Sequence, residues 1–137
     1  MLRLTATLRL ALLLALVGFF GFGSGAQARQ PYPHETTDSV RLAELPSEAR
    51  QTLRLIQRGG PFPFPHKDGD IFGNFENRLP PQARGYYHEY TVPTRSQRDR
   101  GAWRIVAGEG KAGDVATSGE YYFSADHYRS FSRIRPP

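Results

Sequence analysis

Four charged or titratable side chains in the second half of the chain could together act on a phosphate ester: Glu89, Arg100, Arg104 and His127. Alternate residues of a β-strand point to the same face. Glu89 in the stretch GYYHEYTV and Arg104 in AWRIVA could therefore lie side by side if these stretches pair. A carboxylate can remove a proton, a histidine can protonate a leaving oxygen, and arginines can neutralise charge on phosphorus. Because no metal-binding cluster is evident in the sequence, this set predicts attack by an internal hydroxyl, such as the 2′-hydroxyl of RNA.

Each of these residues also has a purely structural explanation. Opposite charges on neighbouring strands, such as Glu89 and Arg104, form cross-strand ion pairs that only stabilise a sheet. A single histidine such as His127 is more often a surface side chain than a catalyst. His88 should point to the face opposite Glu89, so we assign it no role. The residue types alone leave both explanations open.

One helix and several strands are expected to position these side chains. Between Pro46 and Arg58 apolar residues recur at spacings of three and four, and Gly59-Gly60 supplies a stop, which predicts a single helix. This order of elements predicts an α+β fold, with one main helix packed on a twisted antiparallel β-sheet. Short extended pieces rich in β-favouring residues are expected at residues 40–45, 71–72, 85–92, 102–107, 120–124 and 128–134.

The first residues of the chain have the pattern of a secretory signal peptide. Arg3 and Arg9 precede an apolar stretch at residues 10–22, and an Ala-Gln-Ala cleavage pattern ends at Ala28. The apolar stretch is shorter than the about 20 residues needed to span a bilayer. The expected organisation is a signal peptide, a flexible lead-in and one domain, at residues 1–28, 29–39 and 40–137.

The composition narrows the classes further. The chain has 137 residues, a formal net charge of +5 and no cysteine. This length excludes a multidomain enzyme, and the lack of cysteine excludes a disulfide-stapled scaffold and a zinc–thiolate site. With the export signal, these features predict a secreted protein without stable membrane association once the signal is removed.

Five segments follow one another along the chain: LPSEARQTLRLIQRGGPFPF, DGDIFGNFENRLP, GYYHEYTV, RGAWRIVAGE and DHYRSFSRI. In this order they resemble the microbial guanyl-specific ribonucleases, above all the secreted bacterial Sa-type enzymes and barnase. The resemblance covers about residues 40–135 and implies the microbial ribonuclease fold. It also implies an endoribonuclease without metal or cofactor that cleaves single-stranded RNA on the 3′ side of guanosine. The products would be a 2′,3′-cyclic phosphate and then its hydrolysis product.

The resemblance implies a role for each member of the acid–base set. The glutamate of the YHEYTV segment, Glu89, corresponds to the general base of the family. The histidine of the DHY segment, His127, corresponds to its general acid. Arg100 and Arg104, in the RGAWR segment, correspond to the arginines that contact the scissile phosphate.

A second group of residues corresponds to the family's guanine site. Glu76 matches the glutamate that recognises guanine, helped by the loop backbone around Gly73 and Asn74. Phe72 and Tyr128 match the aromatic residues that flank the base. Guanine offers two adjacent donors to one carboxylate, whereas adenine presents an acceptor at the same place, so such a site should reject adenine.

Three positions depart from the pattern of the family. Phe75 stands before Glu76 where relatives carry an arginine, which changes the charge of the base loop. Arg41 stands where Sa-type relatives carry a cysteine, so their disulfide is missing. Trp103 replaces a basic residue between the two phosphate arginines. None of these changes removes a catalytic group.

Three functions remain in competition on the sequence. The leading one is a secreted guanyl-preferring endoribonuclease acting as a monomer on single-stranded RNA. The second is a catalytically idle RNA-binding module of the same fold. The third is a toxin-like effector ribonuclease controlled by an acidic, barstar-like inhibitor protein.

Overall fold

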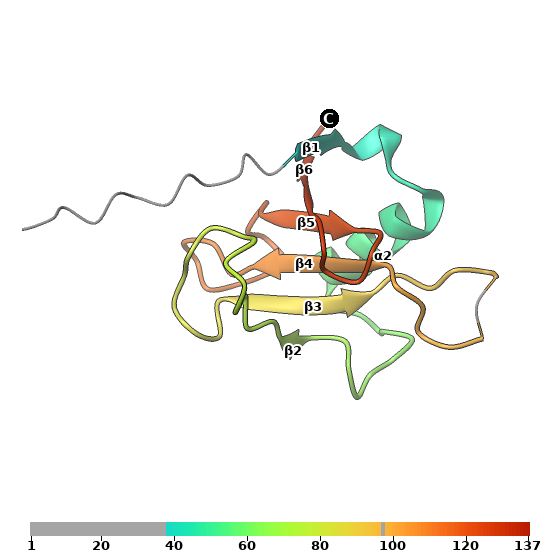
Figure 1. Ribbon diagram of the computed structural model, residues 1–137, viewed down its shortest axis with the longest axis horizontal. Coiled ribbons are helices and arrows are strands. Elements are labelled where there is room, and N and C mark those ends of the chain that lie inside the picture. Colours follow the sequence, from blue (N-terminus) through green and yellow to red (C-terminus); the bar gives the residue numbers. More distant parts are fainter. Residues whose placement is uncertain (1–37, 97) are drawn as a thin grey trace, which may run out of the picture. The chain divides into compact units, whose positions relative to one another are not determined.

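The computed structural model describes residues 38–96 and 98–137. The expected signal peptide and most of the lead-in lie outside these residues. Six strands form one sheet in the order β1-β6-β5-β4-β3-β2, and helix α2 packs against it (Figure 1). The elements are β1 (Asp38–Arg41), the 3-10 helix η1 (Leu42–Glu44), α2 (Ser47–Arg58), β2 (Asp70–Ile71), β3 (Tyr87–Thr91), β4 (Arg104–Gly108), β5 (Tyr121–Ser124) and β6 (Ser132–Arg135).

Helix α2 begins and ends as the sequence predicts. It starts directly after Pro46 and stops at Gly59, whose φ of +79° is the left-handed conformation that glycine adopts without a Cβ clash. The amides of Gly59 and Gly60 then donate to the last free carbonyls of the helix, those of Ile56 and Leu55, at 3.2 and 2.9 Å. This end turns the chain back toward the sheet.

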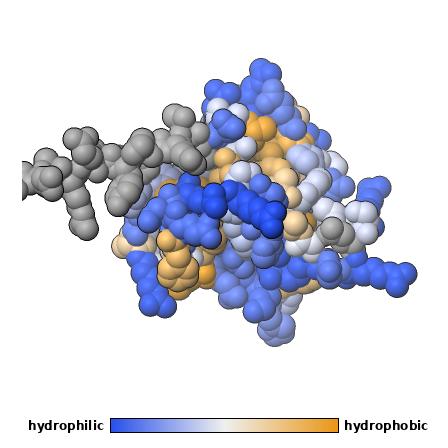
Figure 2. Space-filling model, in the orientation of Figure 1, coloured by the Kyte–Doolittle hydropathy of each residue, from blue (hydrophilic) through white to orange (hydrophobic). Residues whose placement is uncertain are grey.

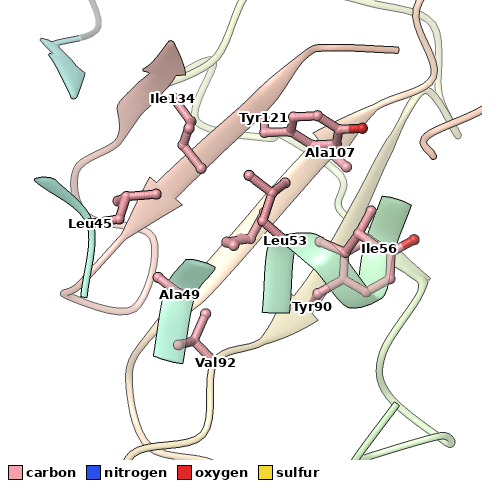
Figure 3. Packing of buried hydrophobic residues seen from close by; sticks show 10 residues of the cluster. Leu45, Ala49, Leu53, Ile56, Tyr90, Val92, Ala107, Tyr121 and Ile134 are labelled. Carbon is pink, nitrogen blue, oxygen red and sulfur yellow. The ribbon is translucent and has the colours of Figure 1, made fainter. Parts of the chain in front are cut away.

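The apolar stripe that begins at Leu45 and continues along helix α2 supplies four of the ten buried residues of the main core. Leu45, Ala49, Leu53 and Ile56, the residues whose spacing predicts the helix, are all buried. Burial of side chains the size of Leu53 and Ile56 is worth about 1.5–3 kcal/mol each, which is what attaches the helix to the sheet. Figure 3 shows the sheet residues that they meet, Tyr90, Val92, Ala107, Tyr121 and Ile134.

The α+β class is confirmed, and the sheet is mixed rather than wholly antiparallel. Strands β2 to β6 pair antiparallel, but β1 pairs with β6 in parallel, with Val40 opposite Ile134. The expected extended piece at residues 40–45 is therefore an edge strand that begins at Asp38 and gives way to η1. The last strand begins at Ser132 and not at Tyr128, because residues 126–130 form a hydrogen-bonded turn.

The face of the sheet away from α2 carries a second, smaller core. Leu79, Tyr87, Val106, Tyr122 and Phe131 are buried there, beneath the loops before β3 and after β5. Figure 1 looks onto this face, with α2 behind the strands. In the same orientation, the surface is largely hydrophilic, with smaller hydrophobic areas between the hydrophilic residues (Figure 2). Within the described part of the chain, no helix is long and apolar enough to cross a membrane.

Candidate active site

A cleft of about 660 Å³ lies on the side of the sheet opposite α2. Strand β3 and two loops, at residues 71–78 and 127–129, enclose it. Seven of the nine residues singled out in the sequence line the cleft, and the other two, Arg100 and Arg104, contact members of its lining. The lining residues are Ile71, Phe72, Gly73, Asn74, Phe75, Glu76, Arg78, Glu89, His127, Tyr128 and Arg129.

Glu89 is held in the middle of strand β3, with its side chain only 18% exposed. One carboxylate oxygen, Oε2, accepts a hydrogen bond of 2.6 Å from the hydroxyl of Tyr128. The other, Oε1, lies 3.7 Å from Nη2 of Arg100. Glu89 also lines the cleft, so its carboxylate is placed to take up a proton from a hydroxyl bound there.

Arg104 occupies the first position of β4 and is only 3% exposed. Its Nη1 donates to the carbonyl oxygens of Arg100, Gly101 and Trp103, at 3.2, 2.8 and 2.8 Å. Its Nε donates to the hydroxyl of Tyr128 at 3.1 Å. These contacts fix a buried positive charge beneath the cleft, where solvent screens it little.

Glu89 and Arg104 are not the neighbouring pair that the sequence suggested. The register of β3 and β4 sets Glu89 opposite Val106 and Arg104 opposite Thr91, so the two charged residues are diagonal. Among the described residues no direct ion pair joins them. The hydroxyl of Tyr128 bridges them instead, since it donates to Glu89 and accepts from Arg104. The structural alternative, in which Glu89 and Arg104 form a direct cross-strand ion pair, is therefore wrong.

Arg100 takes the place of Arg104 as the cation beside Glu89. Its Nε donates to the hydroxyl of Thr91 at 3.0 Å, and its guanidinium lies 5.9 Å from the centre of the Phe64 ring. Its Nη2 is buried, yet it makes no hydrogen bond within the described part of the chain. A buried donor without an acceptor is costly, and Oε1 of Glu89, at 3.7 Å, is too distant to accept a hydrogen bond from it.

His127 is carried by a tight turn between β5 and β6. The Asp126 carboxylate holds this turn by accepting hydrogen bonds from the hydroxyls of Ser124 and Ser130, at 2.9 and 2.6 Å, and from the Ser130 amide at 2.9 Å. The bond from the Ser130 hydroxyl is the main cause that lowers the pKa of Asp126 to about 2. The turn gives His127 a φ of +56° and an exposed side chain. The imidazole is thus presented to the cleft by a charged turn.

Phe72 and Tyr128 are stacked on one another rather than apart. Their ring centres are 5.1 Å apart and the ring planes differ by 28°. A base that contacts a ring on each face at about 3.5 Å needs the two rings about 7 Å apart. The rings expected to flank a base therefore have to separate before one can enter. Burial, and then the hydrogen bond to Glu89, raises the pKa of Tyr128, so its hydroxyl keeps its proton.

The loop at residues 73–79 is braced by one asparagine. The Asn74 side chain donates to the carbonyl of Leu79 at 2.9 Å and accepts from the Leu79 amide at 3.0 Å. Its backbone has a φ of +47°, and its carbonyl accepts from the amide of Asn77 at 2.9 Å. Leu79 is fully buried in the second core. Asn74 therefore stabilises the loop, because its side chain binds the backbone of the buried residue Leu79.

Glu76 and Phe75 stand at the rim of the cleft. The Glu76 side chain is 72% exposed and accepts a hydrogen bond of 2.6 Å from Nε of Arg78. Phe75 is 91% exposed, and its ring lies over Gly73 so closely that a Cβ there would clash with it. Gly73 is thus needed for this packing. The position before Glu76 therefore presents an aromatic ring to solvent.

The described residues contain no group of three or more His, Cys, Asp or Glu side chains that could hold a metal ion.

His88, to which the sequence analysis assigned no role, lies outside the cleft lining. It contacts the carbonyl of Gly69 at 2.9 Å and the carboxylate of Glu109 at 3.2 Å. The arrangement in the cleft can therefore combine a carboxylate, an imidazole and two arginines without further groups from the chain.

Comparison with known proteins decides the family. A family model described as ribonuclease matches residues 27–135. Guanyl-specific ribonuclease St of Saccharopolyspora erythraea is 53% identical over 94 residues, which are 69% of this chain and 84% of the relative. Guanyl-specific ribonuclease Sa of Kitasatospora aureofaciens is 48% identical over 100 residues, which are 73% of this chain and 96% of the relative. The chain belongs to the microbial guanyl-specific ribonuclease family.

The fold of this ribonuclease agrees with that of solved relatives. A crystal structure of ribonuclease Sa2 with guanosine-2′-cyclophosphate superposes with a TM-score of 0.63 at 44% identity, covering 73% of this chain and 97% of that one. The match covers nearly the full length of the relative, so the ribonuclease domain is represented as a whole. The resemblance noted in the sequence is confirmed at the level of family and fold.

Two features of this ribonuclease's cleft were missed by the sequence analysis. Arg78 and Arg129 line the rim, and the hydroxyl of Tyr128 links the general-base candidate to Arg104. Exposed loops carry no hydrophobic period, so nothing in the pattern places an arginine at a cleft. The proximity of Arg78 to Glu76 along the chain was the one available signal, since a short turn can bring such neighbours together.

Proposed function

We propose that this chain is a secreted, guanyl-preferring endoribonuclease that cleaves single-stranded RNA on the 3′ side of guanosine. The observation that carries the proposal is the convergence of Glu89, Arg100, Arg104 and His127 around one cleft, in a chain of the guanyl-specific ribonuclease family. Its relative ribonuclease Sa2 has been solved with guanosine-2′-cyclophosphate and with 3′-GMP.

The first step is an internal transesterification. Glu89 removes the proton of the 2′-hydroxyl, and the oxygen attacks phosphorus to form a new P–O2′ bond. The P–O5′ bond breaks, and protonated His127 gives its proton to the leaving O5′. Arg100 and Arg104 offset the negative charge that grows on the phosphoryl oxygens. The buried Nη2 of Arg100 supplies a donor for one of these oxygens.

The second step opens the 2′,3′-cyclic phosphate. Neutral His127 takes a proton from water, the water oxygen bonds to phosphorus, and the P–O2′ bond breaks. Glu89, which carries the proton from the first step, returns it to O2′. Both residues end in their starting protonation states, so the cycle needs no other group.

The Tyr128 hydroxyl occupies the position where the substrate has to bind. It donates to Glu89 and accepts from Arg104, which are the contacts proposed for the 2′-hydroxyl and the phosphate. Binding therefore moves the tyrosine ring away from Phe72, and the guanine base takes the space between them. Stacking on two rings favours any base, by about 1–3 kcal/mol, so the choice of guanine rests on hydrogen bonds.

We expect the enzyme to release 2′,3′-cyclic phosphates after G from a defined single-stranded RNA oligonucleotide, at a rate unchanged by excess chelator. Mass spectrometry of the products, with and without the chelator, makes the measurement. Retained RNA binding without cleavage would favour the idle module instead. A large loss of rate that a divalent ion restores would contradict the mechanism above.

Substitution of Glu76 by alanine should reduce the ratio of kcat/KM for GpA over ApA at least tenfold, or about 1.4 kcal/mol. The carboxylate accepts both guanine donors, N1–H and the 2-amino group, in charge-assisted hydrogen bonds. Phe75→Arg is the matched comparison in the same loop and should change the ratio much less. If Glu76→Ala keeps the parent ratio, guanine is recognised elsewhere.

Export, a monomeric state and control by an inhibitor are further parts of the proposal. The signal pattern at residues 1–28 supports export, and N-terminal sequencing of the exported protein should then begin at Arg29. Two cationic side chains that line the cleft, Arg78 and Arg129, suit an acidic inhibitor protein as they suit RNA. Sedimentation of the purified protein tests the monomeric state.

A further inference from the structure

We infer that Arg78 is a positioning residue that sets how strictly this chain selects guanine, an inference that rests on the proposed function. Both Arg78 and Glu76 line the cleft, and Nε of Arg78 donates to Oε2 of Glu76 at 2.6 Å. A hydrogen bond between two charged groups at this distance orients the carboxylate as well as attracting it.

The backbone of Arg78 is held firmly enough to orient another side chain. The next residue, Leu79, is 0% exposed, and both its amide and its carbonyl are bound by the Asn74 side chain. The carbonyl of Pro80 accepts a hydrogen bond of 2.8 Å from the hydroxyl of Tyr87, a buried residue of β3. The backbone that carries the Arg78 side chain is thus attached to the sheet, whereas Glu76 lies in the exposed part of the loop.

The contact leaves the carboxylate able to bind guanine. A carboxylate has about four acceptor sites on its two oxygens. Arg78 uses one on Oε2, and the N1–H and 2-amino groups of guanine need two more. The arginine therefore selects one orientation of Glu76 without competing with the base. Without it the side chain, 72% exposed, samples several rotamers and binding has to bear the cost of ordering it.

The pair contributes to recognition far more than to the fold. Exposed ion pairs add little to stability because water screens them, and Arg78 and Glu76 are 41% and 72% exposed. A bound base excludes water from this rim and strengthens the interaction. The neighbouring Phe75 offers neither charge nor a donor, so it cannot replace Arg78 in this task. Loss of the arginine should therefore change selectivity while leaving the melting temperature nearly unchanged.

The test compares kcat/KM for GpA, IpA and ApA in the parent, Arg78→Gln, Arg78→Lys and Arg84→Gln. Inosine lacks only the 2-amino group, so the G-over-I ratio reports the second hydrogen bond to the carboxylate. Arg78→Gln should reduce both the G-over-A and the G-over-I ratio at least fivefold, with the rate on ApA within twofold of the parent. Arg78→Lys keeps the charge but not the planar Nε donor, and should restore the ratios only in part. Arg84→Gln, an exposed arginine outside the cleft lining, should keep the parent ratios.

An equal fall of all three rates in Arg78→Gln, with both ratios kept, would overturn the inference, since Arg78 would then only attract RNA. The double variant Glu76→Ala/Arg78→Gln separates this failure from that of the proposed function. If the inference holds, the double variant has the ratios of Glu76→Ala alone, because Arg78 acts through Glu76. A further drop below Glu76→Ala would contradict it. If Glu76→Ala itself keeps the parent ratios, the proposed guanine site fails.

Discussion

Replacement of Glu89 by glutamine should lower kcat/KM for RNA about 100-fold or more, because general-base catalysis is worth at least that much. The amide has nearly the same shape as the carboxylate, and its oxygen can still accept the hydrogen bond of Tyr128. It cannot, however, take a proton from the 2′-hydroxyl. Steady-state kinetics on GpA, with the melting temperature measured on the same samples, makes the comparison.

The matched control is Glu109→Gln. Glu109 directly follows strand β4 and contacts a histidine, His88, but it lies outside the cleft lining. Its substitution should leave the rate on GpA within about twofold. A loss of activity in Glu89→Gln that comes with a fall in melting temperature of more than about 10 °C would instead favour a structural role. A fall of that size corresponds to more than about 1 kcal/mol for a domain of this length.

Replacement of His127 by alanine should slow RNA transesterification by about 100-fold to 10,000-fold, since the 5′-oxygen is a poor leaving group without a proton. With guanosine 3′-(4-nitrophenyl phosphate) as substrate, the leaving group is 4-nitrophenolate, a stable anion that needs no proton, so the rate on this substrate should fall much less. The ratio of the two effects, measured on the same enzyme, identifies the general acid. His66→Ala is the control, because His66 is exposed in the proline-rich loop before β2. If His127→Ala cleaves RNA at the parent rate, the assignment is wrong.

The pH dependence of kcat/KM provides a second test of the His127→Ala variant. A base that must be ionised and an acid that must be protonated give kcat/KM a bell-shaped profile, and His127→Ala should remove the alkaline limb. The Asp126 carboxylate, which holds the turn that carries His127, stays charged over the pH range of this profile. The pKa of Asp126 is lowered from its ordinary 3.8 to about 2, so the folded protein keeps this carboxylate charged down to about pH 2, and the stability from its charge is lost progressively as the pH falls from the ordinary value through about 2. The acidic limb therefore reports the chemistry rather than the loss of the turn.

The helix and most of the strands could be predicted from the sequence because their determinants are local. The spacing of Leu45, Ala49, Leu53 and Ile56 and the glycine stop at Gly59 act within a few residues. Strand β3 was equally visible as a stretch of β-favouring residues. The parallel pairing of β1 with β6 could not be predicted, because it joins residues from the two ends of the described chain and neither segment carries a sequence pattern that indicates it.

The candidate site residues could be named from the sequence because short segments of the chain resemble those of a known family. Their mutual arrangement could not. Whether Glu89 faces Arg104 or lies diagonal to it depends on strand register, which side-chain packing across the sheet decides.

The sequence by itself determined the helix, most of the strands, the family and the list of candidate groups. Only the tertiary structure decided that Tyr128 links Glu89 to Arg104, that Phe72 stacks on Tyr128, and that Arg78 donates a hydrogen bond to Glu76. The physical reason is range: periodicity and capping act over one or two turns, whereas Tyr128 and Glu89 meet across 39 residues of chain. Contacts of that kind exist only once the sheet has brought its loops to a common face.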